Sequence, residues 1–427
     1  WSNENLNFLK KGLFSELNGS YNIKTKKDFS IQNVNFVSNK SFLTVKNNEN
    51  EKSLNTNISG KLNWEKKKNL LEFSDLIIGD HLIVSGKIDL ISQKGYSNFS
   101  IQKVAVEDIK KYINDFFKYN QFYSKLNFKK ISNKFRGGNL KNLNINVKFS
   151  LFEEFIIEEI IGSSNFSNTR FDYSDKIFKK LLSTISGNLD FRLKSQNLND
   201  SLFNINFSAA DGFILVNNYI QYKFSKARLG GQFYNNSFVI SKADFFKNSD
   251  LEYTFDNIRI TNDTLTVEKA KHIKEKKVQY TINDTNININ NMNVTKSTLK
   301  LKNNEELSSY IKRKFDIELI GNSDLVFFLS GNLKNLNFNL KLNSNLKNSF
   351  LKIHYLNLIK KKDTISSIES EITMIKGQIA TLKNTLLSIG SKSYKIGHIE
   401  FNNKNTKFLL KNLVTPNINI DKIILIN

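Results

Sequence analysis

Apolar and polar residues alternate with a period of two over much of this chain. One thirteen-residue phrase shows the pattern twice: Gly138–Ser150 reads GNLKNLNINVKFS and Gly331–Asn343 reads GNLKNLNFNLKLN, with nine identical positions. In each copy a glycine turn is expected to precede a strand. The alternation then places Ile145, Val147 and Phe149 on one face of that strand, and the intervening Asn and Lys residues on the other.

Shorter copies of the same theme predict a long sheet built from repeated strands. The copies follow Gly60, Gly86, Gly187 and Gly231. No Pro-rich or Gly/Ser-rich linker separates them, so one continuous architecture is favoured over separate domains. The glycine pairs Gly137–Gly138 and Gly230–Gly231 are expected at strand starts, where they supply turns or bulges.

The strand pattern is clearest in a set of short segments bounded by turn residues. They are Ile83–Leu90, Phe99–Val104, Leu189–Leu193, Phe203–Phe207, Phe213–Val216, Phe238–Ile240, Ile258–Ile260, Ile287–Ile289, Phe315–Ile320 and Leu325–Ser330.

Four other segments depart from this pattern. Apolar residues at three- and four-residue spacing predict a helix over Val106–Phe135, or two short helices broken near Asn120. This segment either caps a stretch of sheet or lies on a membrane surface. Glu305–Lys314 is predicted to be a second, short helix. Phe178–Thr184 is expected to be a short helix or turn, and the charged run Lys269–Lys277 a loop.

The segment Ile365–Ile389 allows two interpretations. Its apolar residues keep the three-four spacing of a coiled-coil seam. Its many Ile and Thr residues and the central Gly377 favour strands instead. Strands are the preferred interpretation, and a helix stays open.

Composition shows that the chain is rich enough in apolar residues to fold. The 427 residues are 39% hydrophobic and 12% aromatic, with 35 Phe, so the chain is not disordered by composition. The net charge of +23 comes almost entirely from Lys, with only six Arg. This surplus is typical of an AT-rich coding sequence, or it indicates attraction to an anionic surface such as lipid headgroups or nucleic acid. Scarce Arg argues against nucleic-acid recognition.

No constellation for catalysis or metal binding is found in the sequence. Cys is absent, and the four His residues lack metal-ligand spacing: His81, His272, His354 and His398. No nucleophile elbow, phosphate loop or dinucleotide fingerprint occurs. The acidic cluster Glu153, Glu154, Glu158 and Glu159 alternates with apolar residues, which predicts the charged face of a strand or helix. We therefore expect no enzyme activity, no cofactor and no metal site.

Three segments carry a pattern shared with a known family. Ile317–Ser366 contains a SGNLKNLNFNLKL strand, a SNLKNSFLKI crossover and a Lys-rich end. Phe128–Ser195 contains RGGNLKNLNINVKFS, IIGSSNFSNTRFDYSD and ISGNLDFRL, and Ser367–Phe401 has the character of closing hairpins. Together these segments resemble the AsmA-like family of Gram-negative envelope proteins, and within it the YhdP-type branch. The likeness rests on glycines and alternating apolar residues over about two thirds of the chain.

The resemblance implies a mainly β fold: an elongated, open, curved antiparallel sheet forming a groove, with a few short helices. It implies a periplasmic protein held to the inner membrane by an N-terminal helix, with contacts at the inner and outer membranes and with other envelope proteins. The chain begins at Trp1 and has no uninterrupted apolar run of about 18 residues, so that anchor is expected to precede the given sequence. The expected segments are a groove over 1–105, a helical insertion over 106–135, a central groove over 136–304 and a C-terminal AsmA-like groove over 305–427.

A sheet with one apolar face must cover that face. In this family the occupant is phospholipid, whose acyl chains would lie along the groove while the headgroup stays wet. The expected lining residues are Ile145, Val147, Phe149, Leu189, Phe191, Leu193, Phe203, Ile205, Phe207, Phe338, Leu340 and Leu342. A structural or adhesive repeat protein with a closed, dry core is the alternative, and a nucleic-acid-binding module is a further one, disfavoured by the absence of its known patterns.

Overall fold

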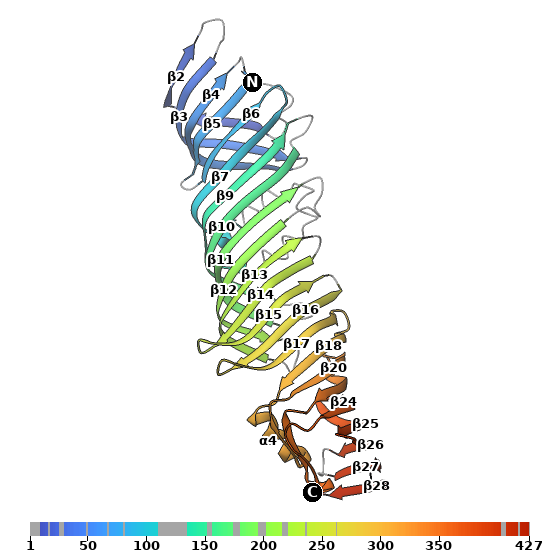
Figure 1. The fold of residues 1–427 in the computed structure, drawn as a ribbon. Coiled ribbons are helices and arrows are strands. Elements are labelled where there is room, and N and C mark those ends of the chain that lie inside the picture. The colour runs from blue at the N-terminus through green and yellow to red at the C-terminus, as the bar shows by residue number, and fades with distance from the viewer. Residues whose placement is uncertain are drawn as a thin grey trace. The chain divides into compact units, whose positions relative to one another are not determined.

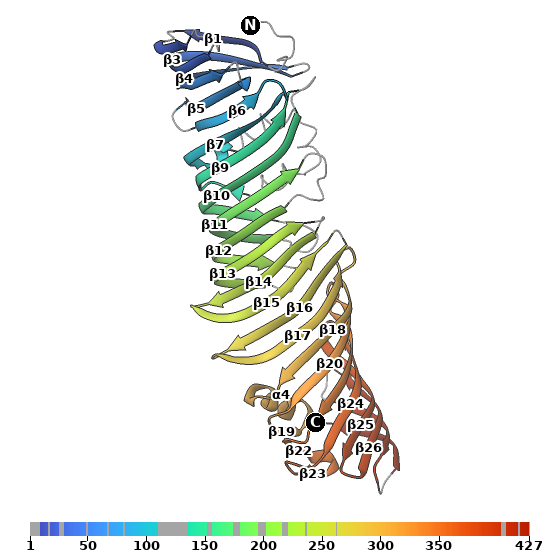
Figure 2. The same cartoon turned by 45° about the horizontal axis from the view of Figure 1, so that its top comes forward.

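The computed structural model describes residues 9–15, 18–24, 30–47, 50–65, 68–79, 82–109, 135–151, 156–173, 180–194, 202–215, 221–234, 237–261, 263–402, 407–416 and 419–426. These residues are mainly in antiparallel β-strands, and the described helices are short. The expected fold class is therefore confirmed: a mainly β chain with one long open sheet and few helices (Figures 1 and 2).

The strands follow one another along the chain. They are β1 (Leu9–Ser15), β2 (Asn18–Lys24), β3 (Ser30–Asn47), β4 (Asn50–Glu65), β5 (Leu70–Ile78), β6 (Leu82–Asp89), β7 (Lys94–Ala105), β8 (Phe135–Arg136), β9 (Asn139–Ser150), β10 (Ile156–Tyr173), β11 (Lys180–Lys194), β12 (Leu202–Leu215), β13 (Gln221–Tyr234), β14 (Ser237–Lys247), β15 (Asp250–Ile260), β16 (Thr264–Lys274), β17 (Lys277–Asn288) and β18 (Asn293–Lys302).

The remaining elements include the α-helix α4 and the 3-10 helix η4. They are α4 (Glu305–Phe315), β19 (Ile317–Gly321), β20 (Asp324–Asn332), β21 (Asn337–Asn345), β22 (Ser349–Ile353), the 3-10 helix η4 (His354–Leu356), β23 (Leu358–Lys360), β24 (Ser366–Ile375), β25 (Gln378–Ile389), β26 (Lys392–Asn402), β27 (Lys407–Val414) and β28 (Asn419–Ile426).

Neighbouring strands in the chain are usually neighbours in the long sheet. The ladder runs from β3 through β7 by successive antiparallel pairs, and β7 then pairs with β9 because β8 pairs with β10 instead. Later, β18 pairs with β20 and β21 with β24. The strands left out, β19, β22 and β23, form a separate three-stranded sheet.

The chain divides into two compact units. The first contains Trp1–Tyr173, Lys180–Gly212 and Gly230–Asn236, and the second contains Ser174–Lys179, Phe213–Leu229 and Ser237–Asn427. Two of the boundaries fall within β12 and β13, and the others lie outside the strands. Each unit is described by itself below.

Helix α4 is specified locally by its end residues. The side chain of Asn304 caps the first turn by accepting a hydrogen bond of 2.8 Å from the backbone N–H of Leu307. Glu305 and Glu306 lie in the first turn, where carboxylates suit the helix dipole. Asp316 ends the helix in a left-handed conformation. The predicted helix over Glu305–Lys314 is thus confirmed.

The ambiguous segment Ile365–Ile389 is a β-hairpin. Strands β24 and β25 pair in antiparallel register, with Ile375 opposite Gln378 at the turn. The turn residues Lys376 and Gly377 both have positive φ. The strand interpretation is therefore confirmed.

Four other expectations were wrong in part. Lys269–Lys277 is not a loop, because it forms the end of β16 and the start of β17 with only a tight turn between them. Residues 180–184 of Phe178–Thr184 are strand, and Gly230–Gly231 lies inside β13. The helix expected over Val106–Phe135 is helical at 106–109, its residues 110–134 lie outside the described part of the chain, and Phe135 belongs to β8.

The repeated phrase adopts two conformations. Its identical hexapeptide NLKNLN, at 139–144 and 332–337, is continuous strand in β9 but forms the turn between β20 and β21 in the second copy. There the Asn332 side chain accepts hydrogen bonds from the backbone N–H groups of Lys334 and Asn335, as an Asx turn does. Gly331 consequently ends a strand and does not begin one. Only the apolar alternation that follows the hexapeptide is shared.

Many long strands contain an Asn or Asp with left-handed backbone in their interior. Among the described residues, these side chains are exposed and their φ values lie between 48° and 55°. They are Asp75, Asn142, Asn168, Asp211, Asn257, Asp284, Asn384 and Asn412. Asn and Asp tolerate this conformation better than other side-chain-bearing residues do.

These residues share a local sequence pattern that alternation alone does not reveal. In β9 the order is Leu140-Lys141-Asn142-Leu143, and in β15 it is Phe255-Asp256-Asn257-Ile258. The outer two residues of each quartet lie on the apolar side, and the inner two face away from it. Register shifts accompany several of these sites, as β-bulges require. The pattern therefore shifts the phase of the alternation by one residue within a strand.

We expect Asn142→Val to lower the free energy of unfolding by about 1–2 kcal/mol, because a β-branched residue is strained at positive φ. Asn142→Gly should remain close to wild type. Urea unfolding checks both. Asn146→Val is the matched control, since Asn146 is exposed on the same strand with ordinary backbone. Equal losses at positions 142 and 146 would show that the left-handed backbone is not what matters.

Candidate functional site

The expected lining residues of β9, β11 and β12 lie within the first unit. Ile145, Val147, Phe191 and Phe203 are half-buried and pack against the buried residues Ile157, Ile160 and Leu193. Phe149 is buried, and Leu189, Ile205 and Phe207 are half-buried. The polar residues that alternate with the lining residues of β9 are exposed on the opposite face. They are Asn144, Asn146 and Lys148. The apolar and polar faces expected for β9 are therefore present.

The strand register joins these side chains into a row that crosses the sheet. Val84 of β6 is opposite Phe99 of β7, which is opposite Ile145 of β9. Ile145 is opposite Gly162 of β10, and Gly162 is opposite Phe191 of β11. The ring of Phe191 then stacks on Phe203 of β12, with centroids 6.2 Å apart. One apolar row therefore passes over six strands.

Glycine in these strands makes room for a phenylalanine ring on the neighbouring strand. Gly162 is opposite Phe191, Gly95 opposite Phe149, and Gly86 opposite Phe73. A Cβ added at Gly95 would lie 2.6 Å from Cζ of Phe149, and one at Gly86 would lie 2.7 Å from Cζ of Phe73. Gly86, which the sequence pattern predicts as a turn, is therefore a strand residue that a ring covers, and Gly95 and Gly162 are covered in the same way.

The polar face of β10 carries a buried carboxylate held by two cations. Glu159 is 7% exposed, and its carboxylate contacts Nζ of Lys148 at 2.8 Å and Nε of Arg192 at 2.5 Å. These partners come from the strands on either side, β9 and β11. Hydrogen bonding from Lys148, followed by that from Arg192, holds the pKa of Glu159 below its ordinary value. The ion pairs thus join three strands on the face opposite the apolar row.

The acidic cluster expected from the sequence is only partly covered by the structure. Glu153 and Glu154 lie outside the described residues. Glu158 is half-buried, and its carboxylate lies 3.6 Å from Nζ of Lys94. Glu158 and Glu159 therefore form ion pairs within the sheet, consistent with a charged strand face.

The second unit has its own apolar row. Ile260, Leu265, Ile287 and Val294 are successive partners across β15, β16, β17 and β18. The row continues through Gly331 of β20 to Phe338 of β21, then to Met374 and Ile379 in the β24–β25 hairpin. Phe338 is half-buried, so this expected lining residue belongs to a continuous apolar row as well.

A different row crosses the opposite ends of the same strands. Tyr253, His272 and Tyr280 are successive partners on β15, β16 and β17. The His272 ring lies 4.8 Å from that of Tyr253 and 4.9 Å from that of Tyr280. Burial lowers the pKa of His272, so its neutral form is favoured. On β18 and β20 the row continues with Leu301 and Leu325. On β15–β17, by contrast, its polar groups lie at the strand ends opposite Ile260, Leu265 and Ile287.

Tyr222 of β13 adds a further polar side chain beside Tyr253, His272 and Tyr280. Its hydroxyl donates a 2.7 Å hydrogen bond to the carboxylate of Glu252, and its ring meets that of Tyr253 edge-on at 5.2 Å. Burial, and then the bond to Glu252, raise the pKa of Tyr222. The hydroxyl therefore stays protonated at neutral pH and acts as a hydrogen-bond donor.

Leu340 and Leu342 lie in a closed core. They are buried with Leu319, Leu351 and Leu358 from the three-stranded sheet β19–β22–β23. Helix α4 adds Leu307 and Ile311, which pack against the same cluster. We call α4 and this small sheet the cap, because together they cover the apolar face of β20, β21, β24 and β25. At these two positions the protein itself covers the residues expected to line a groove.

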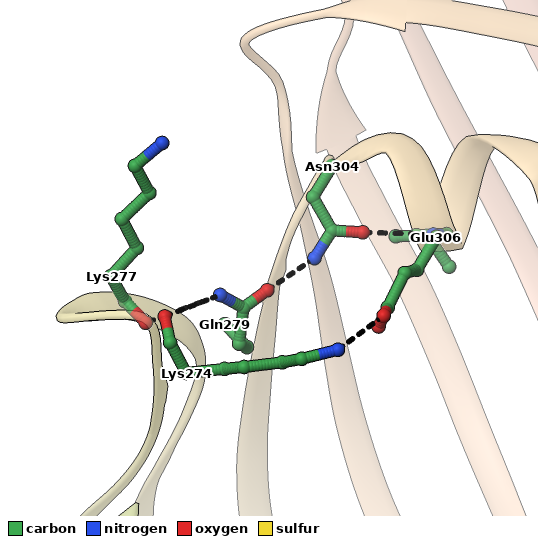
Figure 3. A network of polar contacts seen from close by, with 6 residues as sticks. Lys274, Lys277, Gln279, Asn304 and Glu306 are labelled. Atoms are coloured by element: carbon green, nitrogen blue, oxygen red, sulfur yellow. Dashed lines mark hydrogen bonds and ion pairs between the residues drawn. The ribbon is translucent and has the colours of Figure 1, made fainter. Parts of the chain in front are cut away.

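Polar contacts tie the start of α4 to the β16–β17 hairpin (Figure 3). Lys274 donates to Glu306 at 2.5 Å, and the Asn304 amide donates to the side-chain oxygen of Gln279. Gln279 in turn donates to the backbone oxygens of Lys274 and Lys277. These side chains are at or near the surface, so the contacts position the helix while adding little to stability.

The structure shows no arrangement that would hold a metal in its described part. There, His, Asp and Glu do not gather into any group of three or more suited to a metal ion. Two of the histidines contact different carboxylates. Nε2 of His354 lies 3.4 Å from the carboxylate of Glu318, and Nε2 of His398 lies 2.9 Å from that of Glu400. His81 lies outside the described residues. Within the described ranges, no helix is long and apolar enough to span a bilayer.

Gly162→Ala should lower the free energy of unfolding by about 1–3 kcal/mol, because the added methyl group overlaps the Phe191 ring. In a Phe191→Ala background the same change should cost less, since the ring is gone. A double-mutant cycle from urea unfolding measures this coupling. Additive effects would contradict the proposed packing of ring on glycine.

Stability should fall in acid partly because Glu159 becomes protonated. Its folded pKa is lower than its unfolded pKa, so its contribution is complete above the unfolded value, near the ordinary 4.5, and is lost as pH falls through the folded value. Glu159→Gln should therefore be less stable than wild type at pH 7 and show a flatter decline below about pH 5. Urea midpoints measured from pH 7 to pH 3 test this, with Glu305→Gln, an exposed helix carboxylate, as control.

Comparison with known proteins does not place the chain in a family. No protein-family model matches it, and neither a curated protein nor a solved structure is significantly similar to it. A function for this chain is therefore inferred from the side chains on the apolar and polar faces of its long sheet.

Proposed function

We propose that the apolar face binds the acyl chains of phospholipid and lets lipid move along it between the inner and outer membranes. In this proposal the chain is a non-enzymatic protein of the periplasm, attached to the inner membrane. The observation that carries the proposal is the half-burial of the row through Ile145, Phe191 and Phe203. A closed core of the kind found under the cap buries such residues more completely.

The bulges support a trough whose inner side is apolar. At each left-handed Asn or Asp, two successive residues lie on the polar face. Extra backbone on one face makes that face longer, so the strand bends toward the other face. The same bend repeated along a ladder would curve the sheet around its apolar face. Long strands such as β9, β10 and β11 are curved along their length in Figure 1.

The uniformity of the face suits movement better than tight binding. Each CH₂ of an acyl chain gains about 0.8 kcal/mol when it leaves water for an apolar surface. A row of Val, Ile and Phe side chains offers nearly equal contacts at each strand, so neighbouring positions of the chain differ little in free energy. Such a lipid would be held against water yet free to slide, and no bond chemistry is needed.

A structural protein with a closed core is the second candidate. The cap favours it locally, because Leu340 and Leu342 are covered by Leu319, Leu351 and Leu358. The two candidates predict opposite lipid contents for the purified protein. A lipid-binding face requires bound phospholipid, whereas a closed structural repeat has none.

We expect purified protein to carry phospholipid that mass spectrometry detects after solvent extraction. Ile145→Asp should reduce that content at least about fivefold, because a carboxylate on the apolar face has no partner there and repels hydrocarbon. Phe191→Asp, on the same row, should act in the same direction. Asn146→Asp is the matched control, since it places a carboxylate next to position 145 on the polar face.

Circular dichroism and urea unfolding establish that each variant is folded before its lipid is counted. Folded wild-type protein without phospholipid would reject the proposal in favour of a structural role. Equal lipid contents in Ile145→Asp and Asn146→Asp would also reject it, because the bound lipid would then lie elsewhere. In cells, loss of lipid binding is expected to make the envelope more permeable.

A further inference from the structure

The small sheet of the cap has a second face that points away from the core. Leu319, Leu351 and Leu358 face inward and are buried. Because side chains alternate along a strand, Ile320, Phe350 and Ile359 belong to the opposite, outer face. Ile320 is 59% exposed and Ile359 is 55% exposed, which is unusual for aliphatic residues in ordered strands.

The register brings these residues together into one patch. Ile320 of β19 is opposite Phe350 of β22. Lys352, two residues further along β22, is opposite Ile359 of β23. Phe350 and Lys352 share a face of the same strand, so the pairs are adjacent. We call Ile320, Phe350, Lys352 and Ile359 the outer patch.

Lysines surround this patch on the β22–β23 side. Lys347 precedes β22, and Lys361 and Lys362 follow β23; all three are exposed. Asp363 is the acidic residue in this turn. On the β19 side, Glu318 is opposite Lys352 on this same outer face, and its carboxylate is paired with Lys312 at 2.7 Å. The rim is therefore net positive where it is most exposed.

A buried lysine fixes the geometry of this rim. Lys360 is 1% exposed, and its ammonium donates hydrogen bonds to the backbone oxygens of Leu346, Lys347 and Ser349. The three donors of an ammonium are thus all used. This cage holds the turn before β22, which carries Lys347, against β23.

We infer that the outer patch docks on the surface of an anionic lipid bilayer. Exposed aliphatic side chains with lysines along one side match the interface of such a bilayer, where apolar groups enter the acyl boundary and lysines meet the anionic headgroups. The chain's net charge of +23 favours the same encounter. Docking on a bilayer is distinct from holding lipid on the long sheet, so each can fail without the other.

Sedimentation with vesicles tests the docking. The chain of residues 1–427 is mixed with sucrose-loaded vesicles of phosphatidylglycerol and phosphatidylcholine, or of phosphatidylcholine alone. Wild type should sediment with the anionic vesicles at least about tenfold better than with neutral ones. Ile320→Glu/Ile359→Glu should lose at least about tenfold of the binding to anionic vesicles. Ile91→Glu is the matched control, because Ile91 is a 72% exposed isoleucine in the β6–β7 turn and should leave binding unchanged.

A second variant guards against misfolding of the first. Lys361→Glu/Lys362→Glu changes only exposed turn residues and should also reduce binding, with the remaining binding less sensitive to salt. Wild-type binding by either double variant would overturn the inference. Equal binding to neutral and anionic vesicles would overturn it too, as would a wild-type dimer in sedimentation velocity that Ile320→Glu/Ile359→Glu dissociates, since the patch would then join copies of the chain.

Lipid content separates this inference from the proposed function. The outer-patch variants should still carry as much extractable phospholipid as wild type, because the apolar row of β9–β12 is unchanged. Vesicle binding by a protein that carries no lipid would uphold docking and reject the proposed function.

Discussion

The fold depends on keeping apolar residues on one face of strands that bend. A simple alternation cannot do this, because an extra residue at a bulge moves every later side chain to the other face. This chain solves the problem with a quartet in which the first and fourth residues face the apolar side. In β9, Leu140 and Leu143 are thereby placed with Ile145, while Lys141 and Asn142 face solvent. The polar Asn supplies the left-handed backbone that makes this possible.

The glycines complete the same arrangement. A curved sheet brings side chains on its inner face closer together, and Phe rings are the largest of those in the first unit's row. Because Gly162 has no side chain, the Phe191 ring can lie over it. Gly95 makes room for the Phe149 ring in the same way. A sheet with a side chain at each of these positions would have to separate its rings. At these positions the Phe and the Gly on the neighbouring strand therefore serve the same packing arrangement.

Much of the fold could be predicted from alternation, but not the positions of its bends. The β24–β25 hairpin and the helix at Glu305 were predictable because local pattern and end residues agree with the final structure. The run Lys269–Lys277 was not, because a charged hairpin tip looks like a loop until its neighbours pair with it. The hexapeptide NLKNLN shows why local sequence does not fix the positions of bends. The same six residues form a bent strand in β9 and a chain-reversing turn after β20. Pairing with neighbouring strands decides between them.

The sequence predicted which residues lie on the apolar face of the sheet. It did not predict where the cap covers that face. Alternation assigns Ile145 and Leu340 the same role, yet only Leu340 lies beneath the cap, which a pattern of period two cannot detect. The two ends of β15–β17 differ in a further way: one is crossed by Ile260, Leu265 and Ile287, and the other by Tyr253, His272 and Tyr280. An amphipathic guest on this face would gain most with its hydrocarbon on the aliphatic side and its headgroup beside the tyrosines, since hydroxyl and imidazole groups belong at the boundary with water. If the proposed lipid binds there, the asymmetry of these strands would favour one orientation of it over the other.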